Sequence, residues 1–144
     1  MLYFLENLLK LPQISVQNII QEEQEIFLIL MCTDEKVKCQ HCERLTDELH
    51  QKRHVMVRDL SISGQTVYLK VPRRKFYCKH CQHYFTETLE FMNPRRKYTK
   101  RYENYIYQRV NVSSIEQVTR EESLSWGQVN GIYQHQCEAQ KKLE

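Results

Sequence analysis

The sequence predicts an α+β fold, in which a small antiparallel β unit with an N-terminal hairpin precedes a C-terminal helical bundle. Apolar and polar residues alternate in several segments before residue 92, as in half-buried strands. Two Cys-x-x-Cys pairs, at 39–42 and 78–81, lie towards the ends of this β-rich part. After Pro94 no proline occurs, and apolar residues recur at helical spacing. We therefore predict three segments, namely 1–32, 33–92 and 94–144.

The first segment is predicted to form a short helix and a β-hairpin. Pro12 ends the helix, whose apolar residues at helical spacing are Leu2, Phe4, Leu5, Leu8 and Leu9. Residues 14–20 and 25–32 have the composition and length of strands, and the polar turn 21–24 joins them. We expect the helix to pack on this hairpin.

The second segment is predicted to be a mostly antiparallel β unit. Residues 55–58 and 67–71 show strand-like alternation, and a Ser63-Gly64 turn lies between them. Pro72 is expected to break the second strand, because proline has no N–H to donate. The chain should extend again from 74 to 77, up to the second cysteine pair.

The third segment is predicted to hold three helices, the last two arranged as a helix-turn-helix. Apolar residues predict a first helix near 98–110, a second near 114–121 and a third from Trp126, whose apolar face would include Trp126, Val129, Ile132 and Tyr133. Ser-x-x-Glu at 113–116 and Ser-x-x-Gln at 125–128 fit capping boxes at two helix starts. The short turn 121–124 is typical of a helix-turn-helix.

The two cysteine pairs predict one structural zinc ion bound by Cys39, Cys42, Cys78 and Cys81. Two knuckles of this spacing supply four sulfurs in the tetrahedral arrangement that Zn²⁺ prefers, with no open position for catalysis. The 35 intervening residues exceed the usual spacing, so we expect a zinc-ribbon-like unit with an enlarged β insert. An iron–sulfur cluster or a redox role remains an alternative. We expect the ion to fix the basic strand against the helices.

Charge is distributed unevenly along the chain, whose formal net charge is +3. Residues 70–109 contain eleven Lys and Arg against three acidic residues, whereas 1–31 contain one Lys against four Glu. A concentrated positive field suits phosphate, although a solvated surface would have the same composition. We find no membrane span or signal peptide in the sequence and expect a cytoplasmic protein.

Double-stranded DNA is the partner that these features favour. Base edges would be read from the N-terminal part of the last helix by Gln128, Asn130 and Gln134. Phosphates would be held by basic residues around the second cysteine pair and the first helix, namely Arg73, Arg74, Lys75, Arg95, Arg96, Lys97, Lys100 and Arg101.

Several motifs resemble the N-terminal region of the ISL-three family of bacterial insertion-sequence transposases. The likeness covers about residues 35–140 and rests on both cysteine pairs, the block 58–64, the stretch 73–87 and the helix start 124–129. Glu43 and Gln82 stand where this type of knuckle commonly has glycine. The resemblance implies binding to the terminal inverted repeats of a mobile element. It also implies a metal-dependent Asp/Asp/Glu catalytic domain after the helix-turn-helix, for which the chain, ending at Glu144, has no residues. We therefore expect a non-enzymatic DNA-binding portion of a transposase.

Other functions are open at this point. The chain could be a stand-alone regulator that represses a full-length transposase. It could instead be a protein-interaction module whose acidic N-terminal hairpin pairs with another chain through a strand edge. Self-association and contact with full-length transposase are the protein partners that we consider, and basic zinc ribbons can also bind RNA.

Overall fold

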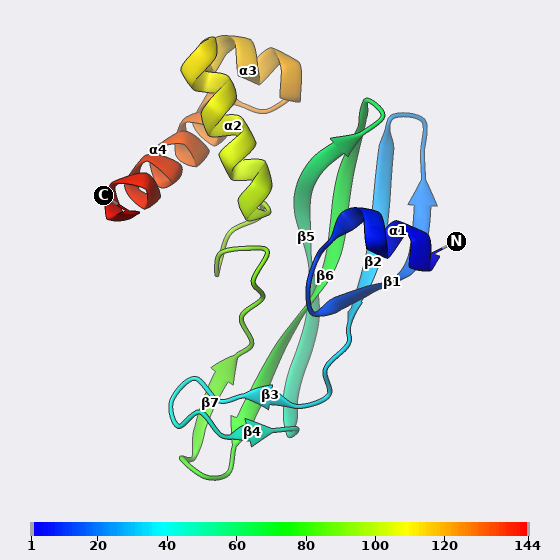
Figure 1. Ribbon diagram of the computed structural model, residues 1–144, viewed down its shortest axis with the longest axis vertical. Coiled ribbons are helices and arrows are strands. Elements are labelled where there is room, and N and C mark those ends of the chain that lie inside the picture. The colour runs from blue at the N-terminus through cyan, green and yellow to red at the C-terminus, as the bar shows by residue number, and fades with distance from the viewer. Residues whose placement is uncertain (1, 144) are drawn as a thin grey trace.

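The structure of the protein is a computed structural model that describes residues 2–143. Its elements in chain order are α1 (Leu2–Leu9), β1 (Ile14–Gln21), β2 (Glu25–Cys32), β3 (Val37–Lys38), β4 (Leu45–Thr46), β5 (Leu49–Ile62), β6 (Gln65–Cys78), β7 (His83–Thr86), α2 (Lys100–Val112), α3 (Ile115–Glu122) and α4 (Trp126–Leu143). The molecule is elongated, with α2 to α4 at one end and β3, β4 and β7 at the other (Figure 1). The predicted α+β class is confirmed.

The hairpin of β5 and β6 runs along much of the molecule and connects its parts (Figure 1). Each strand has 14 residues, so both are longer than the predicted cores 55–58 and 67–71. The chain turns back at Ser63 and Gly64, with φ of 49° and 77°. Glycine adopts positive φ without steric cost, and the predicted turn is confirmed.

The predicted N-terminal hairpin is confirmed, and it belongs to the same sheet as β6. β1 and β2 are antiparallel, whereas β2 and β6 are parallel over 25–29 and 66–70. The strand order is β1-β2-β6-β5, so one parallel pair lies within an otherwise antiparallel sheet. The division into domains 1–32, 33–92 and 94–144 stays a prediction.

The main core lies where α1 and the segment after β7 pack on the sheet. Leu28, Val57 and Leu69 are completely buried there. α1 contributes Leu9, and the segment after β7 contributes Phe91. Burial of such side chains stabilises the fold by about 1.5–3 kcal/mol each. The outer side of α1 is exposed, because Phe4 and Leu8, which we placed in its apolar pattern, are 67% and 63% exposed.

Pro72 lies within β6, so the predicted break at this residue is wrong. Pro72 pairs with His54 of β5. On its other side, β6 pairs with β2 only as far as Lys70 and with β7 only from Lys75 onwards. A proline is tolerated in a strand that has no neighbour on one side, because the missing N–H then removes no ladder hydrogen bond.

The three C-terminal helices form the predicted helix-turn-helix bundle. Its core side chains are all 0–1% exposed and comprise Tyr102, Ile106, Val118, Val129 and Ile132. α3 ends at Glu122, and its C-cap Ser123 adopts the left-handed conformation with φ 54°. Three residues therefore separate α3 from α4, close to the turn that the sequence predicted.

The two predicted capping boxes have different outcomes in the structure. At α3 the N-cap is Ser114, whose side chain accepts from the N–H of Gln117, so the predicted box at 113–116 is wrong. At α4 the predicted box is confirmed. The Gln128 N–H donates to Ser125 Oγ at 3.1 Å, and the Ser125 N–H donates to Gln128 Oε1 at 2.9 Å.

The bundle is attached to the sheet at Arg58 and Asp59 of β5. The carboxylate of Asp59 is 1% exposed and accepts hydrogen bonds from Thr99 Oγ1 at 2.8 Å and from the guanidinium of Arg101. Thr99 is also the N-cap of α2, where its hydroxyl accepts from the Tyr102 N–H. Arg101 reaches further and donates to the Leu9 carbonyl. Asp59 therefore fixes the start of α2 against the sheet and, through Arg101, against the end of α1.

Arg58 adds a second attachment between β5 and the helices. Its guanidinium lies 3.6 Å from the Glu122 carboxylate at the end of α3 and 5.1 Å from the centre of the Tyr102 ring. Burial raises the pKa of Tyr102, so its hydroxyl stays protonated and donates to Glu122 at 2.8 Å. The backbone of Arg58 also exchanges hydrogen bonds with Lys97 and Thr99. The adjacent Arg58 and Asp59 thus join β5 to both α2 and α3.

None of the helices within residues 2–143 is both long and apolar enough to cross a membrane.

We expect Asp59→Ala to lower the free energy of unfolding by about 2–3 kcal/mol. This is less than for a fully buried ion pair, because Arg101 is partly exposed. Urea denaturation of the zinc-loaded protein would measure the change, and hydrogen exchange should show lost protection at the start of α2. Ser61→Ala, at an exposed position of the same strand, is the matched control. A loss no larger than that of the control would contradict a junction role for Asp59.

Candidate metal centre and nucleic-acid interface

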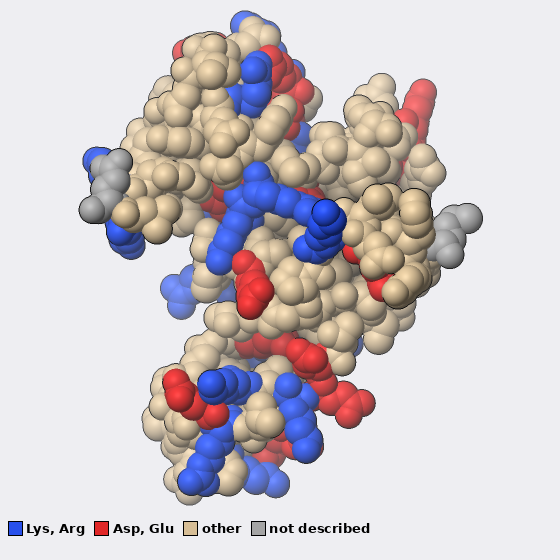
Figure 2. Space-filling model, viewed as in Figure 1, with Lys and Arg blue, Asp and Glu red and all other residues tan. Residues whose placement is uncertain are grey.

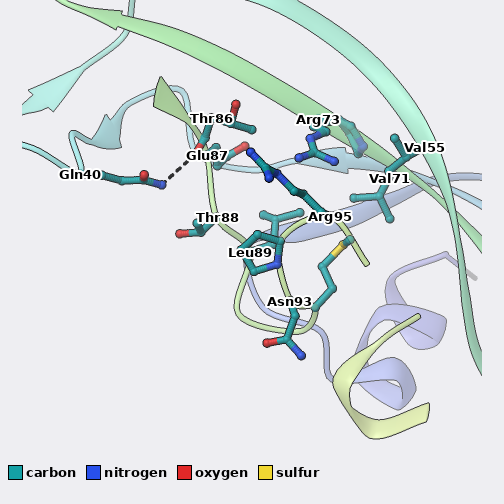
Figure 3. A pocket seen from close by; sticks show the side chains of 13 residues that line it. Gln40, Val55, Val71, Arg73, Thr86, Glu87, Thr88, Leu89, Asn93 and Arg95 are labelled. Atoms are coloured by element: carbon teal, nitrogen blue, oxygen red, sulfur yellow. Dashed lines mark hydrogen bonds between the residues drawn. The ribbon is translucent and has the colours of Figure 1, made fainter. Parts of the chain in front are cut away.

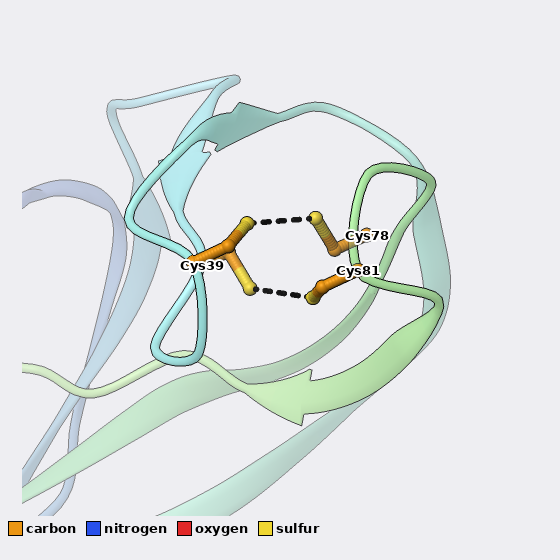
Figure 4. Close-up of side chains that lie close together, drawn as sticks. Cys39, Cys78 and Cys81 are labelled. Carbon is orange, nitrogen blue, oxygen red and sulfur yellow. Dashed lines mark hydrogen bonds between the residues drawn. The ribbon is translucent and has the colours of Figure 1, made fainter.

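The four predicted cysteine ligands converge at the end of the molecule opposite the helices (Figure 4). The sulfurs of Cys39 and Cys81 are 3.6 Å apart, and those of Cys42 and Cys78 are 3.5 Å apart. All four lie within 4.8 Å of one another. A tetrahedral ion with Zn–S bonds of about 2.3 Å places its sulfurs about 3.8 Å apart. The donor set and its spacing therefore fit one structural zinc ion.

Each cysteine pair sits on the same kind of turn. The Glu43 N–H donates to the Cys39 carbonyl at 2.9 Å, and the Gln82 N–H donates to the Cys78 carbonyl at 2.8 Å. Glu43 and Gln82 have φ of 64° and 57°, in the left-handed region that favours glycine. The two positions where the sequence departs from the common knuckle glycine are thus the positions of positive φ.

The thiols of this cluster differ in acidity. Hydrogen bonding from the backbone of Cys81 lowers the pKa of Cys78 to about 7, whereas burial raises the pKa of Cys81 to about 12. Four sulfurs at this distance cannot all become thiolates without a positive charge between them. A divalent cation supplies that charge, and its binding deprotonates the thiols.

The apolar packing around the cysteines is local. Val37, Phe76 and Phe85 form a small core with them, and β7 pairs with the end of β6. Within residues 2–143, strands β3, β4 and β7 make no contact with the helices. The expectation that the zinc ion fixes the basic strand against the helices is therefore wrong, because the Arg58–Asp59 junction makes that attachment.

The other cysteines and the knuckle histidines lie outside the ligand set. Cys32 is beside Glu87, at 3.6 Å, and burial raises its pKa to about 11. The His41 ring packs against His83, and His80 Nδ1 contacts the Arg44 guanidinium at 2.9 Å.

α4 presents polar side chains to solvent, and these side chains differ in exposure. Gln128 and Gln134 are exposed, and Asn130 is half-buried. Gln128 is also engaged in the capping box at the start of the helix. Trp126 is 52% exposed, so our placement of Trp126 on the apolar face is wrong. For Gly127 and Gly131, one turn apart, no atom beyond the chain neighbours and the adjacent backbone of α4 lies within 4 Å of the position that a Cβ would take.

Three of the predicted phosphate contacts are engaged in ion pairs within the protein. Arg74 donates two hydrogen bonds to Glu87, at 2.8 and 2.5 Å. Arg96 pairs with the buried Glu103, and Arg101 pairs with Asp59. A guanidinium held by a buried carboxylate would have to give up that partner before it could bind phosphate. These three residues thus have structural roles in the protein, and their contacts with phosphate stay predictions.

The other five predicted phosphate contacts have no acidic partner among residues 2–143. They are Arg73, Lys75, Arg95, Lys97 and Lys100. In the view of Figure 2, basic side chains gather beside the helices and again at the zinc end. Arg53, which sequence analysis missed, stands opposite Arg73 in the β5–β6 hairpin. The turn alone could not have predicted this pair. Counted from the Ile62–Gln65 pair, Arg53 would stand opposite Arg74, and the register shift between Asp59 and Ile62 moves it to Arg73.

Removal of zinc is expected to unfold the zinc end and to spare the helices. Chelation should increase hydrogen exchange at residues 37–46 and 78–86 and leave α2 to α4 protected, because these parts make no contact. Cys78→Ser should reduce bound zinc from about one per chain to well below it. Cys137→Ser, outside the ligand set, should leave metal content unchanged. Loss of helical protection on chelation would contradict this separation.

Comparison with known proteins agrees with this geometry. The model for the zinc-finger of transposase IS204/IS1001/IS1096/IS1165 matches residues 35–81, and that for the helix-turn-helix domain of transposase family ISL3 matches residues 87–137. The transposase for insertion sequence element IS1001 of Bordetella parapertussis is 28% identical over 105 residues, which are 73% of this chain and 26% of that protein. The chain thus spans about a quarter of the length of this relative. No solved structure matches the chain.

The two matched regions together cover about two thirds of the sequence. The first contains the four-cysteine cluster and the whole long hairpin, and the second contains α2, α3 and α4 as far as residue 137. The chain belongs to the ISL3 family of transposases and carries the family's zinc ribbon and its helix-turn-helix domain.

Proposed function

We propose that the chain binds the terminal inverted repeats of an insertion sequence as double-stranded DNA. In this proposal α4 contacts base edges in the major groove, and unpaired basic residues on neighbouring elements hold the phosphates. The two matched regions are a zinc ribbon and a helix-turn-helix, so the proposal concerns DNA binding and assigns no cutting or joining step to these residues.

The observation that carries the proposal is the pair of glycines on α4. Glycine inside a helix costs about 1 kcal/mol relative to alanine. Gly127 and Gly131 face open space, so packing within residues 2–143 gives no reason for either. A bare helix face allows close approach to a groove of DNA. Asn130 and Gln134 lie near this face, and their amides are suited to bidentate contact with adenine.

Cations near the helices would position the bundle on the DNA backbone. Lys97 and Lys100 flank the Thr99 cap at the start of α2, and both are exposed. Because the Asp59 junction fixes Thr99, these two lysines hold a defined place relative to α4. They supply charge that α4 itself lacks before Lys141.

Gly131→Ala tests the proposal because stability and binding should change in opposite directions. We expect a slightly more stable protein, by up to about 1 kcal/mol, that binds inverted-repeat duplex more weakly because the added methyl group stands on the contact face. Thermal unfolding and fluorescence anisotropy would measure the two effects. Gln140→Ala, more than two turns further along α4, should change neither. Unchanged or tighter repeat binding by Gly131→Ala would overturn the assignment of this face.

Sequence preference should depend on the amides of α4. Asn130→Ala and Gln134→Ala are each expected to reduce the preference for repeat over random duplex by about 1–3 kcal/mol if the residue contacts a base. Trp126 is the single tryptophan of the chain and half-exposed at the start of α4, so its emission should change when repeat duplex binds. Equal affinity of the wild-type protein for repeat and random duplex would contradict specific recognition.

Self-association is a second candidate function, favoured by the exposed side of α1. Tyr3, Phe4 and Leu8 are 63–75% exposed, and β1 is an edge strand of the sheet. Exposed apolar patches commonly mark protein interfaces. We expect light scattering to detect a dimer of the wild-type chain and a monomer of the Phe4→Ser/Leu8→Ser variant. A monomeric wild-type chain at high concentration would remove this candidate.

A further inference from the structure

The half of the β5–β6 hairpin that lies away from the Ser63-Gly64 turn, here called the lower half, brings like charges together across the strands. Arg53 stands opposite Arg73, and Gln51 stands opposite Lys75. Residues two apart on a strand point to the same face, so Arg53, Arg73 and Lys75 share one face of the hairpin. Like charges directly opposite in an antiparallel pair are destabilising. The protein therefore keeps an unfavourable arrangement at this place.

These side chains line two adjoining hollows. One has a volume of about 270 Å³ and is lined by Gln51, Arg53, Arg73, Arg74, Lys75 and Thr86. The other, of about 240 Å³, also contains Arg73 and Thr86 and extends to Arg95 (Figure 3). Arg95 has a φ of 63°, a conformation uncommon for a residue with a side chain. The backbone is therefore conformationally strained at Arg95, in the segment that leads from the zinc ribbon to α2.

No carboxylate neutralises this group of cations among the described residues. Glu87 lines the second hollow, but Arg74 holds it with two hydrogen bonds. Arg53, Arg73, Lys75 and Arg95 form no ion pair within residues 2–143. The Lys75 ammonium lies 5.5 Å from the centre of the Tyr84 ring, a contact that places the charge without cancelling it.

We propose that Arg53, Arg73, Lys75 and Arg95 form a second DNA-binding site, a groove that binds the phosphate backbone of duplex DNA beside the segment read by α4. Guanidinium groups bind phosphate oxygens through paired hydrogen bonds. Gln51 and Thr86 offer neutral donors within the same hollow. The inference rests on the proposed function and adds a contact that is independent of base sequence.

The test compares Arg53→Gln/Arg73→Gln with Lys10→Gln/Lys36→Gln, which removes two exposed charges elsewhere. Binding of repeat and random duplex is measured by fluorescence anisotropy over a range of salt. If each arginine binds one phosphate, the groove variant should lower the slope of log affinity against log salt by about 1.8. Its preference for repeat over random duplex should stay unchanged, and its hydroxyl-radical footprint should shorten on one side.

A second measurement does not depend on DNA. In phosphate-free buffer of low salt, Arg53→Gln/Arg73→Gln should have a higher Tm than the wild-type protein, because the cross-strand repulsion is removed. A lower Tm would overturn the inference, since it would show that the arginines stabilise the hairpin itself.

The possible failures are distinguishable. Wild-type protein that binds no duplex would overturn the proposed function and this inference together. In another outcome, the wild-type protein prefers the repeat while the groove variant has the same salt slope and footprint as Lys10→Gln/Lys36→Gln. That result would overturn the proposed groove and leave the proposed function standing. If inorganic phosphate raises the Tm of the wild-type protein but not of the groove variant, while DNA binding by the two is equal, the groove binds a free anion and the DNA assignment is wrong.

Discussion

The ion pair between Asp59 and Arg101, with the Thr99 hydroxyl on the same carboxylate, determines how the two matched regions are placed relative to each other. A carboxylate that is 1% exposed is costly to bury without partners, so Asp59 requires Thr99 and Arg101 to be in place. Thr99 in turn caps α2, and the position of α2 sets that of α3 and α4. A short block of β5 therefore controls where the helix-turn-helix stands relative to the long hairpin.

The zinc site has a different structural role. Its four sulfurs join the loop after β3 to the end of β6, far from the bundle (Figure 1). Together with the Arg74–Glu87 pair, which ties β6 to the segment after β7, the metal holds the lower hairpin in shape. The cations of that hairpin need such support, because Arg53 and Arg73 repel each other across the strands. The metal and the Arg58–Asp59 junction thus fix opposite ends of the molecule.

Much of this organisation was predictable from local patterns in the sequence. The cysteine spacing identified all four members of the cluster, and the Ser63-Gly64 turn and the helix-turn-helix followed from residue preferences and periodicity. The errors arose where long-range pairing decides the outcome. Pro72 is tolerated within a strand because β6 lacks a neighbour on one side there, which no local window reveals. The ion pairs of Arg74, Arg96 and Arg101 were hidden for the same reason, because their carboxylate partners lie 7 to 42 positions away.

The parallel pairing of β2 with β6 has a consequence for the order of folding. Leu28 aligns with Leu69, and the whole zinc-binding loop and β5 lie between them in the chain. The β5–β6 hairpin can close locally around its turn, but the N-terminal hairpin must find β6 across a long span, and contacts of high sequence separation form slowly. Capture of the metal brings residue 39 next to residue 78 and so shortens the effective span that β2 has to cross. In the cell, the supply of metal would then influence how quickly the sheet is completed, as well as how stable its far end becomes.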